Sequence, residues 1–212
     1  MRSLFSFLTA GLLLAAPALA ADDTFQIDPV HSAAQFSVRH MMISNVRGEF
    51  NKVSGSVVYD GHDPTAARVD ATIDAGSLNT REEKRDAHLK GPDFFDVASF
   101  PTITFVSKKI EKQADGKLKM TGDLTMHGVT RPVSLAVEGP SKPVKDMQGN
   151  ERVGASATTT INRKDFGLTW NKILETGGVA VGDDVAVTID VELVRKHAAA
   201  SGAEKTTTAN KS

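Results

Sequence analysis

The sequence predicts an all-β protein in which seven or eight antiparallel strands enclose one apolar core. Apolar and polar residues alternate in repeated runs from Phe25 onward, and turn-forming residues separate these runs. Residues 80–90 lack the alternation and contain helix-forming residues instead. Each strand must bury its apolar face, which leaves a two-sheet sandwich and a closed barrel as alternatives.

The apolar residues of each run occupy mainly every second position, so one face of each predicted strand is apolar. The predicted inward-facing sets, in chain order, are Ala34, Phe36 and Val38; Val53, Val57 and Tyr59; Val69, Ala71, Ile73 and Ala75; Ile103 and Phe105; Leu118, Met120, Leu124 and Met126; Val129, Val133, Leu135 and Val137; Val153, Ala155, Ala157 and Ile161; and Val185, Val187, Ile189, Val191 and Leu193. The clearest turn signals between them are Asp60-Gly61, Asp115-Gly116, His127-Gly128 and Gly149-Asn150.

Residues 80–90 are predicted to form a helix of about three turns. Thr80 and Glu83 have the spacing of a capping box, and Gly91-Pro92 follows as a stop signal. The apolar stripe is thin, essentially Ala87 and Leu89. We therefore expect the helix to lie across one end of the β-structure and outside its core.

The first twenty residues predict a cleaved secretory signal. They contain a basic start at Arg2, an apolar run over residues 4–16 and small residues up to Ala20. An apolar run of about 13 residues is too short for a membrane-spanning helix, so we expect export with cleavage after Ala20. Residues 21–195 are expected to form one barrel domain, and residues 196–212 a disordered tail of low complexity.

Charge and cysteine content exclude several function classes. Removal of 20 of the 212 residues leaves 192, with 24 basic and 26 acidic residues once Arg2 is gone. This balance argues against nucleic acid as a partner, because nucleic-acid binding requires a concentrated basic face. The absence of cysteine excludes thiol nucleophiles, iron–sulfur clusters and cysteine-ligated zinc.

The sequence contains no convincing catalytic or metal-ligating pattern. The histidines, at positions 31, 40, 62, 88, 127 and 197, show no His-x-His or His-Glu-x-x-His spacing, which favours structural hydrogen bonding over metal ligation. Asp28, His31 and Ser32 supply the side chains of a triad, but strand neighbours point to opposite faces and cannot converge. Glycine-rich nucleotide loops are also absent. We predict no catalytic residue, no metal site and no cofactor.

Aromatic residues are more informative about a binding site. Most of them fit plain core packing. Four of them differ, because they lie in or beside connecting segments, where fewer side chains are needed to fill the core: Phe94, Phe95, Phe166 and Trp170. They are candidates for the mouth of an internal cavity.

Several distinctive sequence blocks follow one another in order over residues 24–195. The blocks are Ile27-Asp28 with His31-Ser32, Val46-Arg47-Gly48-Glu49-Phe50, Ser77-Leu78-Asn79-Thr80, Arg85-Asp86-Ala87-His88-Leu89, Phe94-Phe95-Asp96, Phe100-Pro101-Thr102-Ile103-Thr104-Phe105, the hairpin over residues 122–133, and Ile161-Asn162-Arg163-Lys164-Asp165-Phe166-Gly167. Together they resemble the YceI family of lipocalin-like, polyisoprenoid-binding periplasmic proteins.

The resemblance implies an eight-stranded antiparallel lipocalin-like barrel, with the helix packed near one end and an elongated apolar tunnel for an isoprenoid tail. Polar groups at the mouth would meet the ligand headgroup, and His40 and Arg85 are the candidates. The residues expected to bind the apolar tail are Phe36, Val38, Phe50, Phe94, Phe105, Leu124, Met126, Phe166 and Trp170.

We therefore expect a periplasmic carrier or reservoir for a polyisoprenoid or isoprenoid quinone. It would exchange ligand with the membrane through transient surface contact, as a monomer or a homodimer. One alternative is a solidly packed barrel without a ligand, acting as a secreted interaction or stress-response protein. The other is an enzyme acting on a lipid-like substrate. A void in the lumen argues against the first alternative, and the second requires convergent titratable groups inside the pocket.

Overall fold

The computed structural model describes residues 24–175 and 177–196 of the chain. The predicted signal at residues 1–20 and all but the first residue of the predicted tail lie outside the described residues. The described chain consists mostly of strands with one α-helix, in agreement with the predicted all-β fold class.

Twelve strands and four helical segments follow one another in the described chain. The strands are β1 (Thr24–Ile27), β2 (Ala33–His40), β3 (Ser44–Phe50), β4 (Val53–Val58), β5 (Arg68–Asp74), β6 (Leu78–Asn79), β7 (Thr102–Lys112), β8 (Leu118–Met126), β9 (Val129–Glu138), β10 (Val144–Lys145), β11 (Glu151–Asn162) and β12 (Val181–Arg195). The α-helix is α1 (Glu83–Lys90), and the 3₁₀ helices are η1 (Pro64–Ala66), η2 (Ala75–Ser77) and η3 (Arg163–Phe166).

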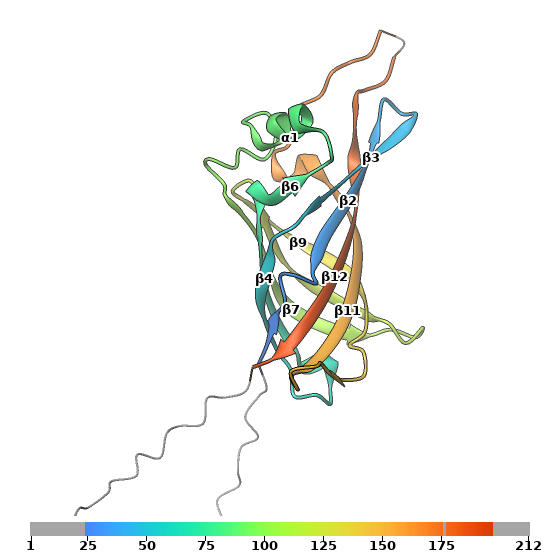
Figure 1. Ribbon diagram of the computed structural model, residues 1–212. Helices are drawn as coiled ribbons and strands as arrows, with labels where there is room; N and C mark the ends of the chain where they lie inside the picture. The colour runs from blue at the N-terminus through green and yellow to red at the C-terminus, as the bar shows by residue number, and fades with distance from the viewer. Residues whose placement is uncertain (1–23, 176, 197–212) are drawn as a thin grey trace, which may run out of the picture.

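The strands form one antiparallel sheet that closes on itself (Figure 1). The closed ring has the order β11-β9-β8-β7-β5-β4-β1-β12, and β12 returns to β11. This closing register is continuous from the Arg152–Val194 pair to the Asn162–Asp184 pair. The ring therefore contains eight strands, which confirms the predicted barrel and excludes the two-sheet sandwich.

The barrel wall is extended along one side of β12. The end of β12 pairs with β1, and the preceding stretch, from Val181 to Asp190, pairs with β2. β2, β3 and β6 thus continue the wall beyond β1, β4 and β5 toward the end where α1 lies (Figure 1). At the opposite end, the Lys196 N–H donates to the Thr24 carbonyl at 2.8 Å. We call these the helix end and the terminal end.

The predicted alternation places apolar side chains inside the barrel. Ala34, Val53 and Leu193, from three different predicted strands, are each at most 5% exposed. One apolar cluster runs from Phe25 at the terminal end to Phe166 at the helix end. Burial of each such aliphatic or aromatic side chain contributes about 1.5–3 kcal/mol, which explains how a chain without disulfides holds a closed sheet.

The α-helix begins three residues later than predicted, at Glu83. Its cap is Glu82, whose carboxylate accepts hydrogen bonds from the backbone N–H groups of Lys84 and Arg85 at 3.2 and 2.6 Å. The predicted Thr80–Glu83 capping box is wrong, because the Thr80 hydroxyl donates to Asp86 instead. Gly91 ends the helix as predicted. Among the described residues, no helix has the length and apolar character of a membrane span.

The predicted turn His127-Gly128 joins β8 to β9 as a two-residue hairpin. Both residues have positive φ, 51° and 73°. Two-residue hairpins favour this backbone because its twist matches that of the flanking strands. The turn therefore fixes the register of β8 and β9, from the Met126–Val129 pair to the Leu118–Val137 pair.

Candidate ligand-binding cavity

Two cavities lie inside the barrel, one after the other along its length. The cavity at the helix end has a volume of about 150 Å³ and the cavity at the terminal end about 180 Å³. Aliphatic and aromatic side chains make up most of the lining of both, with a few polar residues such as Gln35 and Thr104. A cavity of about 150 Å³ with such a lining stays dry and takes up small apolar molecules. The lumen is therefore suited to hydrocarbon and unsuited to polar ligands.

The helix-end cavity is enclosed by strand residues and by the segment around α1. Phe36 and Val38 of β2 and Val187 of β12 belong to its wall. Leu89 of α1 and Phe94 of the following segment close its end. The helix thus lies across one end of the barrel, as predicted, and contributes a single leucine to the lumen.

Five residues line both cavities and form a constriction between them. They are Ile73, Ile103, Leu124, Leu135 and Ile189. A rotamer change in these aliphatic side chains would break no hydrogen bond, so opening of the constriction would leave the barrel wall intact. The two cavities are in effect successive chambers of one lumen.

Aromatic rings form two connected groups at the helix end. Inside the cavity, Phe36 packs on Phe50 with ring centroids 5.8 Å apart, and Phe50 packs edge-on against Phe95 at 5.5 Å. Gly48 makes room for this arrangement, because a Cβ there would lie 2.4 Å from the Phe36 ring.

The second aromatic group closes the helix end. Phe94 lines the cavity and is contacted by Trp170 at 5.1 Å and by His88 at 5.1 Å between ring centroids. His88 and Trp170 also contact each other at 5.0 Å, and His88 Nε2 bonds to Asp93 at 3.0 Å. A ligand leaving through this end would have to displace the Phe94 ring.

Arg163 is the one charged residue in the lining of the two cavities, and no sequence pattern marked it as a site residue. Its guanidinium donates to the carbonyls of Gly182 and Trp170, both at 2.9 Å, and to the Leu168 carbonyl. Burial lowers the pKa of Arg163, an effect that Asp183 opposes. Because its donors are engaged by the protein, Arg163 ties the segment after η3 to β12.

The structure places most predicted tail-binding residues on the lumen. Six of them line the helix-end cavity: Phe36, Val38, Phe50, Phe94, Leu124 and Met126. Phe105 lines the terminal-end cavity. Phe166 is buried in the core but lines neither cavity, and Trp170 contacts Phe94 without reaching the lining.

The two headgroup candidates, His40 and Arg85, lie outside both linings. His40 ends β2 and pairs with Val181 and Ser44. Arg85 donates to the Thr80 hydroxyl at 2.7 Å and to the Thr80 carbonyl at 2.8 Å, which anchors α1 to the residue that follows β6. Their contact with a headgroup stays a prediction.

Several lining residues were outside the predicted set. Those on β12, Val185, Val187 and Ile189, were recognised as inward-facing by their alternation but not assigned to the cavity. Leu89 was visible only as part of a thin helical stripe, and Leu168 had no periodic signal.

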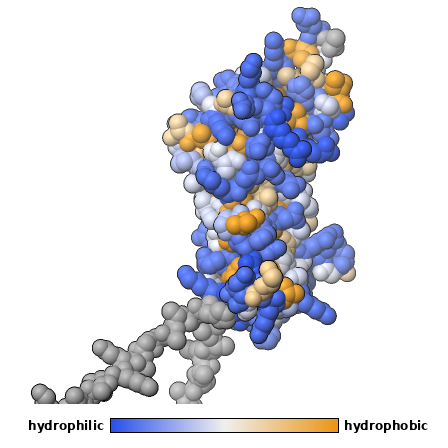
Figure 2. Space-filling model, viewed as in Figure 1, coloured by the Kyte–Doolittle hydropathy of each residue, from blue (hydrophilic) through white to orange (hydrophobic). Residues whose placement is uncertain are grey.

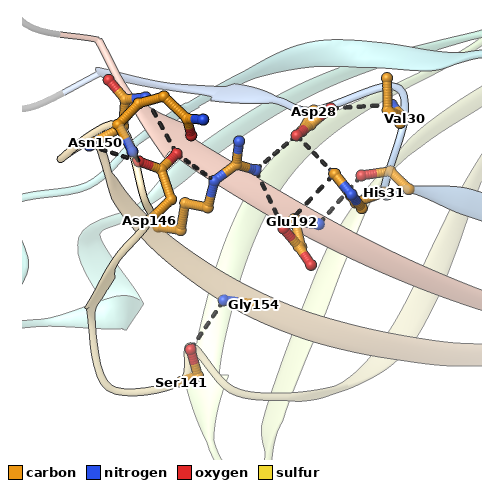
Figure 3. Close-up of polar contacts among 11 residues, drawn as sticks. Asp28, Val30, His31, Ser141, Asp146, Asn150, Gly154 and Glu192 are labelled. Carbon is orange, nitrogen blue, oxygen red and sulfur yellow. Dashed lines mark hydrogen bonds and ion pairs between the residues drawn. The ribbon is translucent and has the colours of Figure 1, made fainter.

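An ionic network at the terminal end surrounds Arg152 of β11 (Figure 3). Arg152 bonds to Asp28 at 2.6 Å, to Asp146 at 2.9 Å and to Glu192 at 3.1 Å. Arg152, and then His31, hold the pKa of Asp28 well below its usual value. Arg152 and Asn150 lower the pKa of Asp146 to about 2.

Asp28, His31 and Glu192 also have ligand atoms within 4.8 Å of one another, as in a metal site. Arg152 already contacts both carboxylates, so a metal ion there would be placed against a guanidinium. The geometry therefore fits an ion-pair network that joins β11 and β12 to the residues directly after β1.

Comparison with known proteins identifies the family. The sequence model of the YceI-like domain matches residues 25–193. The chain belongs to the YceI-like family. Among its curated YceI-like relatives, a UPF0312 protein of Staphylococcus aureus strain MSSA476 is 39% identical over 161 residues, which cover 76% of this chain and 91% of the relative. The corresponding UPF0312 protein of strain N315 is 38% identical over the same length.

Solved structures share the YceI-like barrel. The YceI protein of Campylobacter jejuni is 35% identical, with a TM-score of 0.63 over 74% of this chain and 90% of that one. BcnA of Burkholderia cenocepacia has a TM-score of 0.66 at 23% identity, covering 78% and 98%. A polyisoprenoid-binding domain from Saccharophagus degradans has a TM-score of 0.59 at 16% identity, covering 81% and 98%. At such identities the last two likenesses establish the fold alone.

Proposed function

We propose that this YceI-like protein binds a long apolar molecule in its lumen, a polyisoprenoid or isoprenoid quinone, and acts as a periplasmic carrier or reservoir. The observation that carries the proposal is the pair of carbon-lined chambers separated by a constriction of five aliphatic residues. An elongated, flexible hydrocarbon fits such a lumen better than a compact ligand does. A polyisoprenoid-binding domain from Saccharophagus degradans has the same fold, and the proposal extends the ligand class in its name to this chain.

Hydrocarbon transfer explains why such a carrier would exchange its ligand with a bilayer. Each five-carbon unit gains about 3–4 kcal/mol on leaving water, at roughly 0.8 kcal/mol per buried CH₂. An isoprenoid would therefore have almost no free population in water. Transfer from the apolar bilayer interior to the apolar lumen releases little further hydrophobic free energy, so binding remains reversible. The periplasmic location rests on the predicted secretory signal.

The cavity linings also bear on the two alternative functions, a ligand-free interaction protein and an enzyme. A solidly packed barrel would leave no chambers of this size. An enzyme would require titratable groups that converge on the bound molecule. The two linings contain Arg163 in the helix-end cavity, whose donors are engaged by the protein, and Tyr59 in the terminal-end cavity, so these two groups do not converge. Both considerations favour a binding protein.

The proposal is tested by narrowing the lumen with Val187→Phe. Val187 lines the helix-end cavity, whereas its neighbour Thr188 on β12 is exposed on the outer face. We expect Val187→Phe to weaken binding of a fluorescent polyprenol by about tenfold or more, because the added ring fills space that the tail would occupy. Thr188→Phe is the matched control and should bind like the unmodified protein.

Binding is measured by titration of delipidated protein, with circular dichroism to verify that both variants are folded. Unchanged polyprenol affinity in a folded Val187→Phe variant would contradict binding in the helix-end cavity. Failure of the unmodified protein to bind any polyprenol or quinone would contradict the proposed function itself.

A further inference from the structure

Two hairpins that are far apart in the sequence meet at the helix end. One is the turn between β2 and β3, residues 41–43, and the other, called the 171–180 loop, is described over residues 171–175 and 177–180. The Met41 N–H donates to the Ala180 carbonyl at 2.8 Å, which continues the pairing of β2 with β12. Figure 1 shows both hairpins projecting beyond the barrel, at the opposite end from Thr24 and Lys196.

Large apolar side chains are exposed on these two hairpins. Ile43 is 75% exposed and Ile173 is 81% exposed, and Met41 and Met42 are also exposed. We call these four residues the apolar tip. Figure 2 shows the hydrophobic residues gathered at this projecting end. Four adjacent exposed residues of this size differ from the single exposed apolar residues that are normal on protein surfaces.

The backbone of the tip makes its composition unexpected. Met41 and Met42 have φ values of 49° and 63° in a turn closed by the Ile43 N–H to His40 carbonyl bond at 3.1 Å. The left-handed region is costly for residues with large side chains, and glycine or asparagine is the usual choice there. A turn selected for stability alone would not contain two methionines. This strain indicates a role for the exposed side chains themselves.

The charges around the apolar tip favour an anionic partner. Arg39 and Lys172 lie on the two hairpins, and Arg39 donates to the Met42 carbonyl at 3.0 Å. Glu175 is the one carboxylate in the described part of the 171–180 loop, and the next two carboxylates along the chain, Asp183 and Asp184, are bonded to Lys164 and Asn162. An apolar surface flanked by lysine and arginine is the composition that binds the interface of anionic bilayers.

The apolar tip is continuous with the wall of the lumen. Val38 and Val181 line the helix-end cavity. Val38 is three residues before Met41, and Val181 directly follows Ala180, whose carbonyl accepts the hydrogen bond from the Met41 N–H. A surface that seats the two hairpins would therefore face the helix end, where Phe94 lines this cavity.

We propose that the apolar tip inserts into the interface of an anionic phospholipid bilayer and holds the helix end against the membrane while ligand is exchanged. This inference rests on the proposed carrier function. Two narrow turns offer little area for a stable protein–protein contact, whereas methionine and isoleucine side chains can enter the disordered lipid interface one by one.

Insertion is tested with one environment-sensitive dye on the tip. The chain has no cysteine, so Ile43→Cys provides a unique labelling site. Met147, which is 98% exposed at the terminal end, provides the matched control as Met147→Cys. With vesicles of phosphatidylethanolamine and phosphatidylglycerol, the emission of a dye at position 43 is expected to shift to shorter wavelength, and that of a dye at position 147 is not.

The result that overturns the proposal is no shift at position 43, or equal shifts at both positions. A shift at position 43 that depends on protein concentration and not on lipid also overturns it, because that result identifies a second copy of the chain as the partner. Vesicles of phosphatidylcholine alone test the charge contribution and should bind more weakly.

A triple variant then connects docking to exchange. Met42→Ser, Ile43→Ser and Ile173→Ser together remove most of the apolar tip, and Val30→Ser with Met147→Ser removes exposed apolar residues elsewhere. We expect the tip variant to lose about tenfold or more in vesicle binding and in the rate of polyprenol transfer between vesicles, with the control unchanged.

Polyprenol affinity measured without vesicles separates the two hypotheses, because none of the substituted residues lines a cavity. If the tip variant keeps its polyprenol affinity and still binds vesicles as the unmodified protein does, the docking inference is refuted and the proposed function is not. If the unmodified protein binds no polyprenol, the proposed function fails, whereas the dye measurement still decides whether the tip enters a bilayer.

Discussion

At the scale of single residues, Arg152 and Asp28 stabilise the terminal end of the barrel. Their side chains are 22% and 12% exposed and bond at 2.6 Å. Because Arg152 holds the pKa of Asp28 below its usual value near 3.8, the Asp28 carboxylate stabilises the fold above about pH 4. That stabilisation is lost as the pH falls from there through the lowered pKa of the folded state.

We predict that Asp28→Asn lowers the free energy of unfolding by about 2 kcal/mol at about pH 7, because it removes a charge-assisted hydrogen bond. The difference from the unmodified protein should shrink at about pH 3. Urea denaturation at the two pH values measures both effects. Asp70→Asn, on the exposed face of β5, is the control and should cost little at either pH. A loss that is independent of pH would contradict the electrostatic explanation.

Single residues also show the limit of sequence periodicity. Phe36, Phe105 and Leu124 lie on strands, where alternation fixes which way a side chain points, and all three line the lumen. Phe166 and Trp170 lie in a 3₁₀ helix and the segment after it, where no period applies, and neither lines a cavity. The role of Arg163 depends on carbonyls 5 to 19 residues away, which no local pattern specifies.

At the scale of elements, α1 shows how a tertiary contact overrides a local motif. Thr80 and Glu83 have capping-box spacing, but the Thr80 hydroxyl bonds to Asp86 and the Thr80 carbonyl to Arg85. The chain therefore enters the helix three residues later, and Glu82 caps it. A sequence motif alone cannot reveal that its first residue is engaged elsewhere.

We predict that Glu82→Ala lowers the free energy of unfolding by about 1 kcal/mol, the usual cost of losing an N-terminal cap. Glu83→Ala should cost less, because the Glu83 side chain is not the cap. Thermal unfolding, with hydrogen exchange at the Lys84 and Arg85 amides, compares the two variants. A larger loss for Glu83→Ala would mean that the capping box forms after all.

Of two turns with positive φ angles, one was predicted from the sequence and the other was not, for a physical reason. His127-Gly128 has the composition of a left-handed turn and was recognised, whereas Met41-Met42 also has two positive φ angles and gave no signal. Prediction from turn residues assumes that the chain favours local stability. It fails at the apolar tip, where exposed side chains replace the favoured ones.

At the scale of the whole molecule, alternation predicted strands but could not distinguish a barrel from a sandwich. That choice depends on pairing of β11 with β12 over eleven residue pairs, and of β12 with β1, whose partners lie far apart in the chain. Resemblance to the YceI family supplied the closed barrel. The division of the lumen into two chambers depends on where five aliphatic side chains meet, which the sequence does not indicate.

The central claim is that the two chambers hold one long apolar molecule in the cell. The most direct measurement is organic extraction of the protein purified from its own host without detergent, followed by mass spectrometry of the extract. The account predicts a polyisoprenoid or isoprenoid quinone in an amount comparable to the protein, and much less in the folded Val187→Phe variant. An extract with no such lipid from the unmodified protein would contradict the claim.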